Sequence, residues 1–189
     1  MQEMTAATSI RSVADDPMFA VPVFDEPRWY AVYTCANREK RVAEQFAERS
    51  IEHFLPLYET VRQWKDRRVR LQLPLFPGYI FVNHILRKRL QLLSVSGVVR
   101  LVGFNGIAAA LPPREIESLR DGLRRPVRAE PHPYLTTGER VQILRGPFEG
   151  FQGILRRRRG QLRVVLSIDL IKRSMAVEVG IEDIRPELR

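Results

Sequence analysis

The sequence of 189 residues contains one cysteine, Cys35, and three histidines. A single cysteine cannot form a disulfide within the chain, and no cysteine and histidine residues have the spacing of a zinc site. No apolar run approaches the roughly 18–20 residues needed to cross a bilayer, so we expect no membrane partner. The N-terminus lacks a basic start followed by an apolar block. We therefore expect no secretion signal and a cytoplasmic protein.

Catalytic motifs are also missing from the sequence. No histidine has a carboxylate or cysteine at a spacing that suggests a nucleophile and its base. The phosphate-binding motif G-x-x-x-x-G-K is absent. Glu115, Glu117 and Asp121, on one expected helix, are typical of a solvated face rather than of a nuclease metal cluster. The sequence thus predicts a protein that is not an enzyme and has no cofactor or metal.

Basic residues outnumber acidic ones outside the N-terminus. The net charge is +9, and it is divided as −4 in residues 1–26, +9 in residues 27–137 and +4 in residues 138–189. A positive excess of this kind indicates a polyanionic partner, usually nucleic acid, although it also serves solubility.

Residues 75–82, Leu-Phe-Pro-Gly-Tyr-Ile-Phe-Val, place a proline–glycine turn directly before a strand rich in aromatic residues. Tyr79 and Phe81 are two residues apart and share one face of that strand, while Ile80 and Val82 share the other. This pattern fits a buried central strand. It also fits a strand whose aromatic face is left for a partner protein.

Composition and hydrophobic periodicity divide the chain into four parts. Residues 1–26 are acidic and aperiodic, and are predicted to be a disordered tail. Residues 27–124 have the order β-α-β-β-α-β-α, which predicts an α+β domain with an antiparallel sheet flanked by helices. Residues 125–137 contain three prolines and are predicted to be a linker. Residues 138–189 alternate in short strands, which suits a small β-barrel.

Two helix details follow from the same patterns. Asn37 is a plausible N-cap for the first helix. A short helix near residues 85–93 is expected to place Leu86, Leu90 and Leu93 on one side.

Two segments resemble the NusG family of transcription factors. Residues 29–33 (Trp-Tyr-Ala-Val-Tyr), together with residues 76–82, are similar to the family's N-terminal (NGN) domain. Residues 138–153, from Gly-Glu-Arg-Val to Gly-Pro-Phe-Glu-Gly-Phe-Gln-Gly, are similar to its KOW domain. The likeness covers about residues 27–187 in the family's domain order. It implies an NGN-like domain joined by the linker to an SH3-like KOW barrel.

The resemblance implies a transcription elongation factor that docks on the clamp helices of the largest RNA polymerase subunit and promotes processive transcription. The residues at the matching positions of the docking face are Tyr33, Tyr79, Phe81 and Phe104. We expect them to form an aromatic patch that is open to solvent, on a chain that is a monomer.

Within the family, the chain resembles specialised RfaH-like paralogues more closely than housekeeping NusG. Phe148, Phe151 and Ile171 match the positions through which the KOW domain binds partners. Ile171 stands where housekeeping NusG usually has a Phe, which argues against binding of termination factor Rho. The resemblance therefore implies antitermination on selected operons, with a small-subunit ribosomal protein as a possible KOW partner.

Two alternatives stay open. One is a housekeeping NusG-type factor that couples polymerase to Rho or to the ribosome. The other, from a different class, is a ribosome-associated KOW protein that binds RNA. The 76–82 motif argues against the second, since ribosomal KOW proteins lack that strand.

RfaH hides its docking face beneath a helical form of its C-terminal domain, and an interdomain Glu–Arg pair helps to hold that state. Arg163 matches the arginine, but Leu73 stands at the glutamate position, so this pair cannot form. Residues 162–168 are also rich in β-formers. We therefore predict a permanent β-barrel.

Basic residues gather at three places. The expected hairpin after residue 54 carries Trp64 among five basic residues, which suits contacts to upstream or non-template DNA as well as a solvated turn. Arg38 and Arg41 begin the first helix, and Arg41 matches a basic position that RfaH uses near its DNA element. Residues 156–159, four arginines, indicate either a solvated rim or contact with RNA. The five hairpin residues are Arg62, Lys65, Arg67, Arg68 and Arg70.

Overall fold

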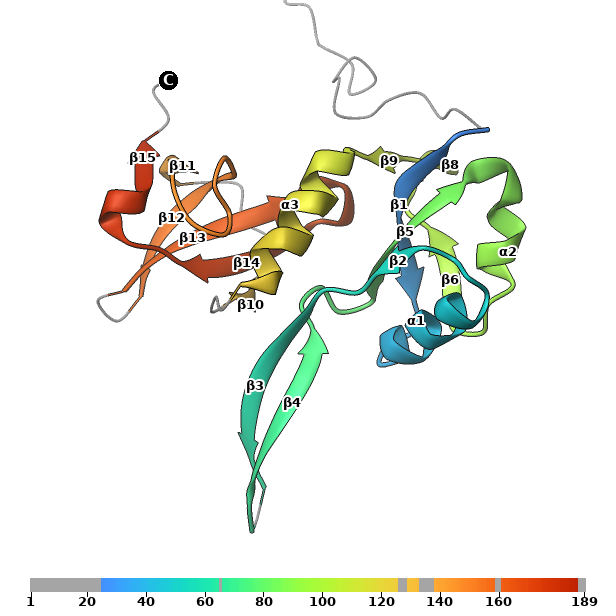
Figure 1. The fold of residues 1–189 in the computed structure, drawn as a ribbon, viewed down its shortest axis with the longest axis horizontal. Coiled ribbons are helices and arrows are strands. Elements are labelled where there is room, and N and C mark those ends of the chain that lie inside the picture. Colours follow the sequence, from blue (N-terminus) through green and yellow to red (C-terminus); the bar gives the residue numbers. More distant parts are fainter. Residues whose placement is uncertain (1–24, 65, 126–128, 133–137, 159–160, 187–189) are drawn as a thin grey trace, which may run out of the picture.

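A computed structural model describes residues 25–64, 66–125, 129–132, 138–158 and 161–186 (Figure 1). The expected tail, apart from Asp25 and Glu26, lies outside the described residues. Within the described residues, no helix is long and apolar enough to span a membrane.

The first half of the chain is built on a five-stranded antiparallel sheet. Its strand order is β2-β5-β1-β6, and β9 also pairs with β1. The aromatic strand of the sequence is β5, which lies between β2 and the central strand β1. The bounds are β1 (Pro27–Thr34), β2 (His53–Phe54), β5 (Tyr79–Ile85), β6 (Val98–Leu101) and β9 (Ala110–Leu111).

The two faces of this sheet have different covers. One face packs against α1 (Glu39–Glu48), the short helix η2 (Leu86–Lys88) and α2 (Arg89–Leu93). The opposite face packs against α3 (Pro113–Arg124). The alternation predicted for the strands is confirmed: Ile80 and Val82 belong to the first core, and Phe81 belongs to the second.

Two hairpins extend the first half. β3 (Leu57–Gln63) and β4 (Arg68–Pro74) form a two-stranded ribbon that projects from the body of the molecule (Figure 1). β7 (Gly103–Phe104) and β8 (Ile107–Ala108) form a much shorter one after β6.

The second half is a six-stranded antiparallel sheet, here called the C-terminal sheet, with the order β10-β14-β13-β12-β11-β15. Short helices η3 (Asp169–Ile171) and η4 (Ile181–Asp183) join its later strands. The strand bounds are β10 (Ala129–His132), β11 (Arg140–Ile143), β12 (Gln152–Arg158), β13 (Gln161–Ile168), β14 (Arg173–Glu178) and β15 (Ile184–Pro186).

The predicted linker is not wholly a connector. Its residues 129–132 form β10, which pairs with β14 at the edge of the C-terminal sheet. Pro131 is compatible with this place because an edge strand does not need every N–H group for pairing.

Two helix predictions are wrong in detail. Asn37 has a left-handed φ of 59°, and the N-cap of α1 is Arg38, which makes no side-chain capping bond. In the second helix Leu92 is buried with Leu86, while Leu90 is 71% and Leu93 38% exposed. The helix begins as a 3-10 turn, which has three residues per turn, and this brings residues 86 and 92 to the same side.

The two halves share one apolar core. Buried residues of the first sheet, including Trp29, Phe76 and Phe81, form a single cluster with residues of α3 and of the C-terminal sheet, including Phe148 and Met175. Helix α3 lies between the two sheets in Figure 1. The C-terminal sheet is therefore packed against the aromatic face of the first half.

Candidate functional site

The turn before β5 is fixed by contacts with two other elements. The backbone N–H of Gly78 donates to Glu39 Oε1 at 2.7 Å, and the N–H of Thr34 donates to the Gly78 carbonyl at 2.9 Å. Gly78 has a φ of +85°, and a Cβ there would lie 3.1 Å from Cε2 of Tyr33. Both properties favour glycine at this residue, and the turn fixes the start of the strand that carries Tyr79.

Three of the four residues expected in the docking face lie together. The rings of Tyr33 and Tyr79 are 5.3 Å apart, centroid to centroid. Phe81 lies between Phe54 and Phe76, with centroid distances of 6.3 and 6.1 Å. Tyr33 and Tyr79 are half-buried, and Phe81 is fully buried.

Phe104 is placed differently. It is on the separate hairpin β7–β8 and is 44% exposed. The expectation of one aromatic patch open to solvent is therefore wrong for Phe81, and only Phe104 of the four is exposed. The physical reason is that other parts of the chain cover the face around β5.

Helix α3 forms the first part of this cover. The guanidinium carbon of Arg120 lies 5.1 Å from the ring centroid of Trp29 and 5.3 Å from that of Phe54. A cation over an aromatic face gains electrostatic attraction from the ring. Arg120 thus holds α3 on the aromatic face of the sheet.

The C-terminal sheet forms the second part. The guanidinium carbon of Arg173, at the start of β14, lies 5.6 Å from the ring centroid of Tyr79. Gly122 of α3 is in close contact with Phe148, because a Cβ on Gly122 would lie 2.2 Å from Cε1 of that ring. The absence of a side chain at residue 122 is what allows the C-terminal half to approach α3.

The residues expected to bind partners of the KOW domain are covered in the same way. Phe148 and Ile171 are each 3% exposed, and Phe151 is half-buried with its ring edge-on to Phe148 at 5.8 Å. All three belong to the core that joins the two halves. In this arrangement the two candidate partner-binding surfaces are buried together.

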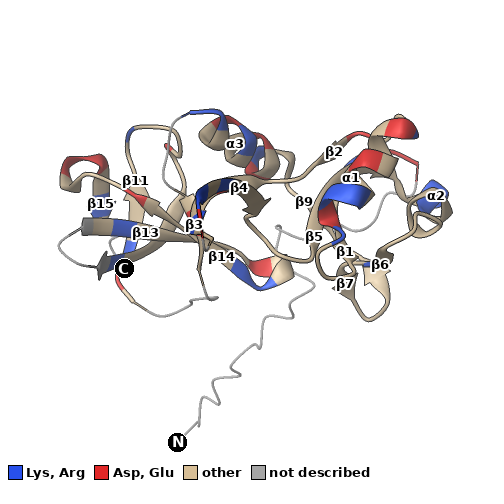
Figure 2. Ribbon diagram, turned by 90° about the horizontal axis from the view of Figure 1, so that it is seen from below, with Lys and Arg blue, Asp and Glu red and all other residues tan. Residues whose placement is uncertain are grey.

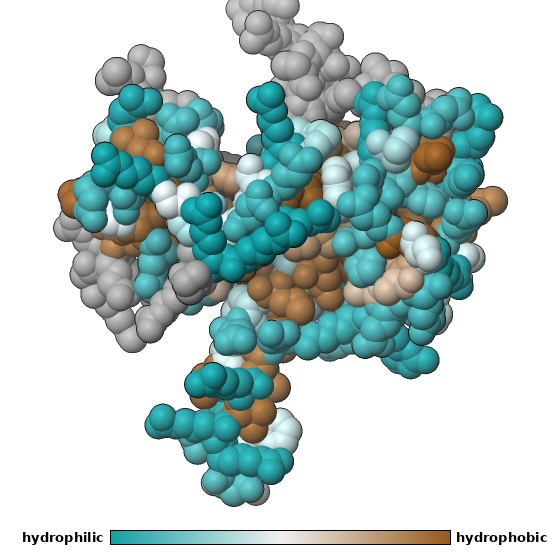
Figure 3. All heavy atoms as spheres, viewed as in Figure 1, coloured by the Kyte–Doolittle hydropathy of each residue, from teal (hydrophilic) through white to brown (hydrophobic). Residues whose placement is uncertain are grey.

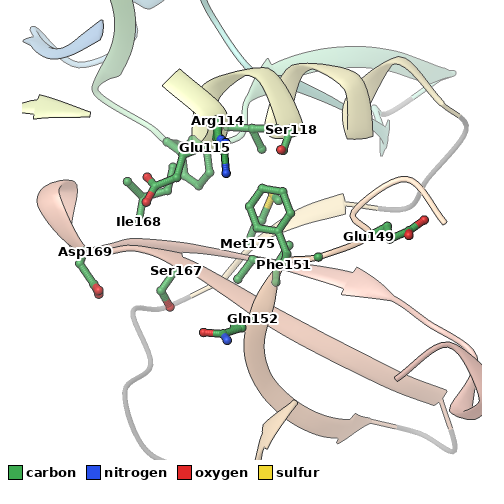
Figure 4. A pocket seen from close by; sticks show the side chains of 14 residues that line it. Arg114, Glu115, Ser118, Glu149, Phe151, Gln152, Ser167, Ile168, Asp169 and Met175 are labelled. Atoms are coloured by element: carbon green, nitrogen blue, oxygen red, sulfur yellow. The ribbon is translucent and has the colours of Figure 1, made fainter. Parts of the chain in front are cut away.

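A cavity of about 520 Å³ remains between α3 and the C-terminal sheet (Figure 4). Its lining includes Glu115 and Ser118 from α3, Phe151 and Met175 from the C-terminal half, and Asp169. Burial raises the pKa of the Glu115 carboxyl above its ordinary value, and the negative charge of Asp169 raises it further. Two acidic side chains therefore line the same cavity at the junction between the halves.

The ribbon β3–β4 carries most of the expected DNA-contacting residues, which Figure 2 shows in blue. Trp64 is 53% exposed, and the guanidinium carbon of Arg67 lies 5.9 Å from its ring centroid. Arg68 and Arg70 share one face of the ribbon, whereas Arg62, paired with Val69, is on the other. Lys65 lies outside the described residues.

The remaining basic candidates divide between described and undescribed residues. Arg38 and Arg41 are both exposed at the start of α1, one helical turn apart. Arg156 is exposed on β12, and the side chains of residues 157–159 lie outside the described ones.

Arg163 has partners within the C-terminal half. It forms an ion pair with Glu130 of β10 and another, at 3.1 Å, with Glu178 of β14. Residues 161–168 are strand β13. The β form expected for this segment is the form observed. Its permanence stays a prediction.

The sequence did not point to Arg120, Gly122 or Arg173. The two arginines contact aromatic rings of the covered face, and Gly122 leaves the space that Phe148 occupies. Gly122 offered a signal, since a glycine inside a helix is unfavourable and usually has a packing reason. The two arginines offered none, because basic residues are common throughout the chain. Within the described residues, no three His, Cys, Asp or Glu side chains are grouped to hold a metal.

Comparison with known proteins points to one family. Residues 27–120 match the family described as "Transcription termination factor nusG". Proteins named "Transcription termination/antitermination protein NusG" are similar over most of the chain. The protein from Rickettsia conorii is 24% identical over 84% of this chain and 89% of its own length, and that from Haemophilus influenzae is 28% identical over 80% and 90%.

A solved structure, described as "Domain interaction in Thermotoga maritima NusG", superposes with a TM-score of 0.55 at 25% identity, and covers 84% of this chain and 96% of that one. Each comparison reaches the same name through a different property, namely the family pattern of residues 27–120, the overall sequence or the fold. Together they support the assignment of this chain to the NusG family of transcription factors, which are not enzymes.

Proposed function

We propose that this NusG-type factor binds the clamp helices of RNA polymerase through the face of β1 and β5 that carries Tyr33, Tyr79 and Phe81, with Phe104 at its exposed margin. The observation that carries the proposal is the aromatic cluster itself, which α3 alone covers among the described helices of the first half. Clustered aromatic residues are typical anchors of protein interfaces.

Docking on this face requires the C-terminal sheet to move away, since Arg173 and Phe148 now occupy its surroundings. The described chain is thus a closed form, and an open form is the one that binds polymerase. The related Thermotoga structure is named for a domain interaction, which supports a closed form of this kind.

In the open form, elongation and antitermination on selected operons are the proposed outcome. Ile171 supports this specialised role because an aliphatic side chain would fill a pocket of Rho shaped for a phenyl ring less well than a phenylalanine does. The basic ribbon β3–β4, with Arg38 and Arg41, then contacts upstream or non-template DNA. Release of the C-terminal sheet also frees Phe148, Phe151 and Ile171 for a small-subunit ribosomal protein.

The decisive experiment measures binding to core RNA polymerase. Gly122→Val inserts a side chain into the space of Phe148, so it should open the two halves and tighten binding. Adding Tyr79→Ala to this variant should then weaken binding about tenfold or more, as expected for loss of an aromatic anchor. Glu117→Val, an exposed position on the same helix, is the matched control.

Equal binding by Gly122→Val with and without Tyr79→Ala would place the docking face elsewhere. Circular dichroism of each variant separates this result from unfolding. Transcription through a terminator, with and without Rho, distinguishes the specialised role from a housekeeping one: read-through that Rho does not oppose supports antitermination.

A further inference from the structure

An apolar groove lies on the first half between α2, β6 and the hairpin β7–β8. Its volume is about 620 Å³, and its apolar lining includes Leu93, Val99 and Ile107, which are 38%, 50% and 57% exposed. Of the eight large hydrophobic residues that are exposed in the described chain, five belong to these elements: Leu90, Leu93, Val99, Phe104 and Ile107. Figure 3 shows hydrophobic surface in the region of α2. Such clustering indicates a surface that something covers.

The groove is separate from the junction of the two halves. Leu86, the buried residue of the groove lining, belongs to the core on the α1 side of the first sheet. This core contains no described residue of the C-terminal sheet. Strand β6 is the last strand of its sheet in the described chain, so one edge of it is unpaired there. An edge strand beside an apolar groove suits an extended segment with apolar side chains.

The charge around the groove indicates which kind of extended segment it can bind. Arg89 lines it, preceded in sequence by Arg87 and Lys88, and no acidic residue is among its described lining. Arg100 also lines it, but its guanidinium lies over the ring of Tyr33 at 5.6 Å. The complementary segment would therefore carry acidic residues beside apolar ones.

The chain itself contains a segment of this kind next to the groove. Residues 15–24 read Asp-Asp-Pro-Met-Phe-Ala-Val-Pro-Val-Phe, two acids followed by eight apolar residues. The next residue, Asp25, accepts a hydrogen bond from Arg87 Nη2 at 2.8 Å. Arg87 follows Leu86, which lines the groove, so the chain enters the described fold at the groove's rim.

We propose that residues 15–24 bind across this groove, with Phe19 and Val21 in contact with its apolar lining and the two acids attracted by the positive charge around it. Ten extended residues reach about 33 Å, which is ample for a groove of this volume. Prolines are compatible with a strand added at an edge. The N-terminal segment is then an intramolecular cover for a surface that the fold leaves apolar.

The test uses the full chain with Cys35→Ser and Val99→Cys, so that one thiol reports on the groove. Phe19→Ser with Val21→Ser should raise the rate of thiol modification at least fivefold, and Asp15→Lys with Asp16→Lys should raise it too. Met4→Ser with Ile10→Ser, at apolar positions N-terminal to residues 15–24, is the matched control and should leave the rate unchanged.

A fast rate in every form would show an uncovered groove and overturn the proposal. A slow rate in every form would show a cover other than residues 15–24. If that rate rises on dilution, the cover is a second copy of the chain. A rate that becomes slow only when RNA polymerase is added would assign the groove to polymerase and would equally overturn the proposal.

Discussion

Gly78 combines two constraints in one residue. Its φ of +85° is a conformation that L-residues adopt at a cost, and a Cβ on this residue would lie 3.1 Å from Cε2 of Tyr33. Gly106 has a similar φ of +79°, but a Cβ on this residue would have no atom within 4 Å. A substitution at Gly106 therefore tests backbone strain alone, and one at Gly78 tests backbone strain together with side-chain crowding.

We predict that Gly106→Ala lowers the free energy of unfolding by about 1 kcal/mol, the strain alone. Gly78→Ala should lower it by roughly twice as much or more, because the ring of Tyr33 must also shift. Urea denaturation of both variants measures the difference. Equal losses would show that Tyr33 moves aside freely.

Phe81 is fully buried, so replacing it affects the stability of the fold as well as any binding. If Phe81 were an open docking residue, Phe81→Ala would lose polymerase binding while its domain stays folded. With the ring fully buried between Phe54 and Phe76, the same variant should lose about 3–5 kcal/mol of stability through the cavity that it leaves. A loss below about 1 kcal/mol in urea denaturation would mean that the face is open in solution. Tyr79, which is half-buried, is the cleaner probe of binding.

At the scale of elements, the ribbon β3–β4 was predictable because hairpins are local. Its alternating residues and its turn lie within one stretch of chain, and register then decides which arginines share a face. Helix α2 was less predictable, because a 3-10 turn at its start alters the spacing of buried residues. Strand β10 was missed because its partner, β14, is more than 40 residues away.

The shared face of Arg68 and Arg70 gives a prediction for DNA binding. If both contact phosphates, replacing both with Ala should reduce the slope of log affinity against log salt by about 2 units. Fluorescence polarisation with a labelled duplex measures this slope. Arg185→Ala, an exposed arginine on the C-terminal sheet, is the control. An unchanged slope in the double variant would leave the ribbon as a solvated projection.

At the scale of the whole molecule, we expect the closed arrangement to depend on the pH through Glu115. Its carboxyl has a raised pKa in the closed form because burial, and then Asp169, disfavour its negative charge. Protonation therefore favours closure. The contribution is complete below the ordinary pKa of 4.5 and is lost as the pH rises through the raised pKa.

We predict that the halves close more completely at pH 4.5 than at pH 7.5, and that Glu115→Gln removes most of this difference by staying neutral. Energy transfer between a dye on Cys35 and a dye on Arg185→Cys reports the separation. Glu117→Gln, an exposed residue of the same helix, should behave as the unchanged chain does. If Glu115→Gln keeps the pH dependence of closure, another titrating group causes it.

The sequence by itself determined most of the local elements and the resemblance to the family, because periodicity, turn residues and short motifs act over a few neighbouring residues. It was sufficient for the alternation in β5, for α3 and for the basic hairpin. Only the tertiary structure decided that the aromatic face is covered. That cover depends on contacts between distant residues, such as Arg173 with Tyr79 and Gly122 with Phe148, and no local pattern encodes which of two apolar surfaces will meet the other.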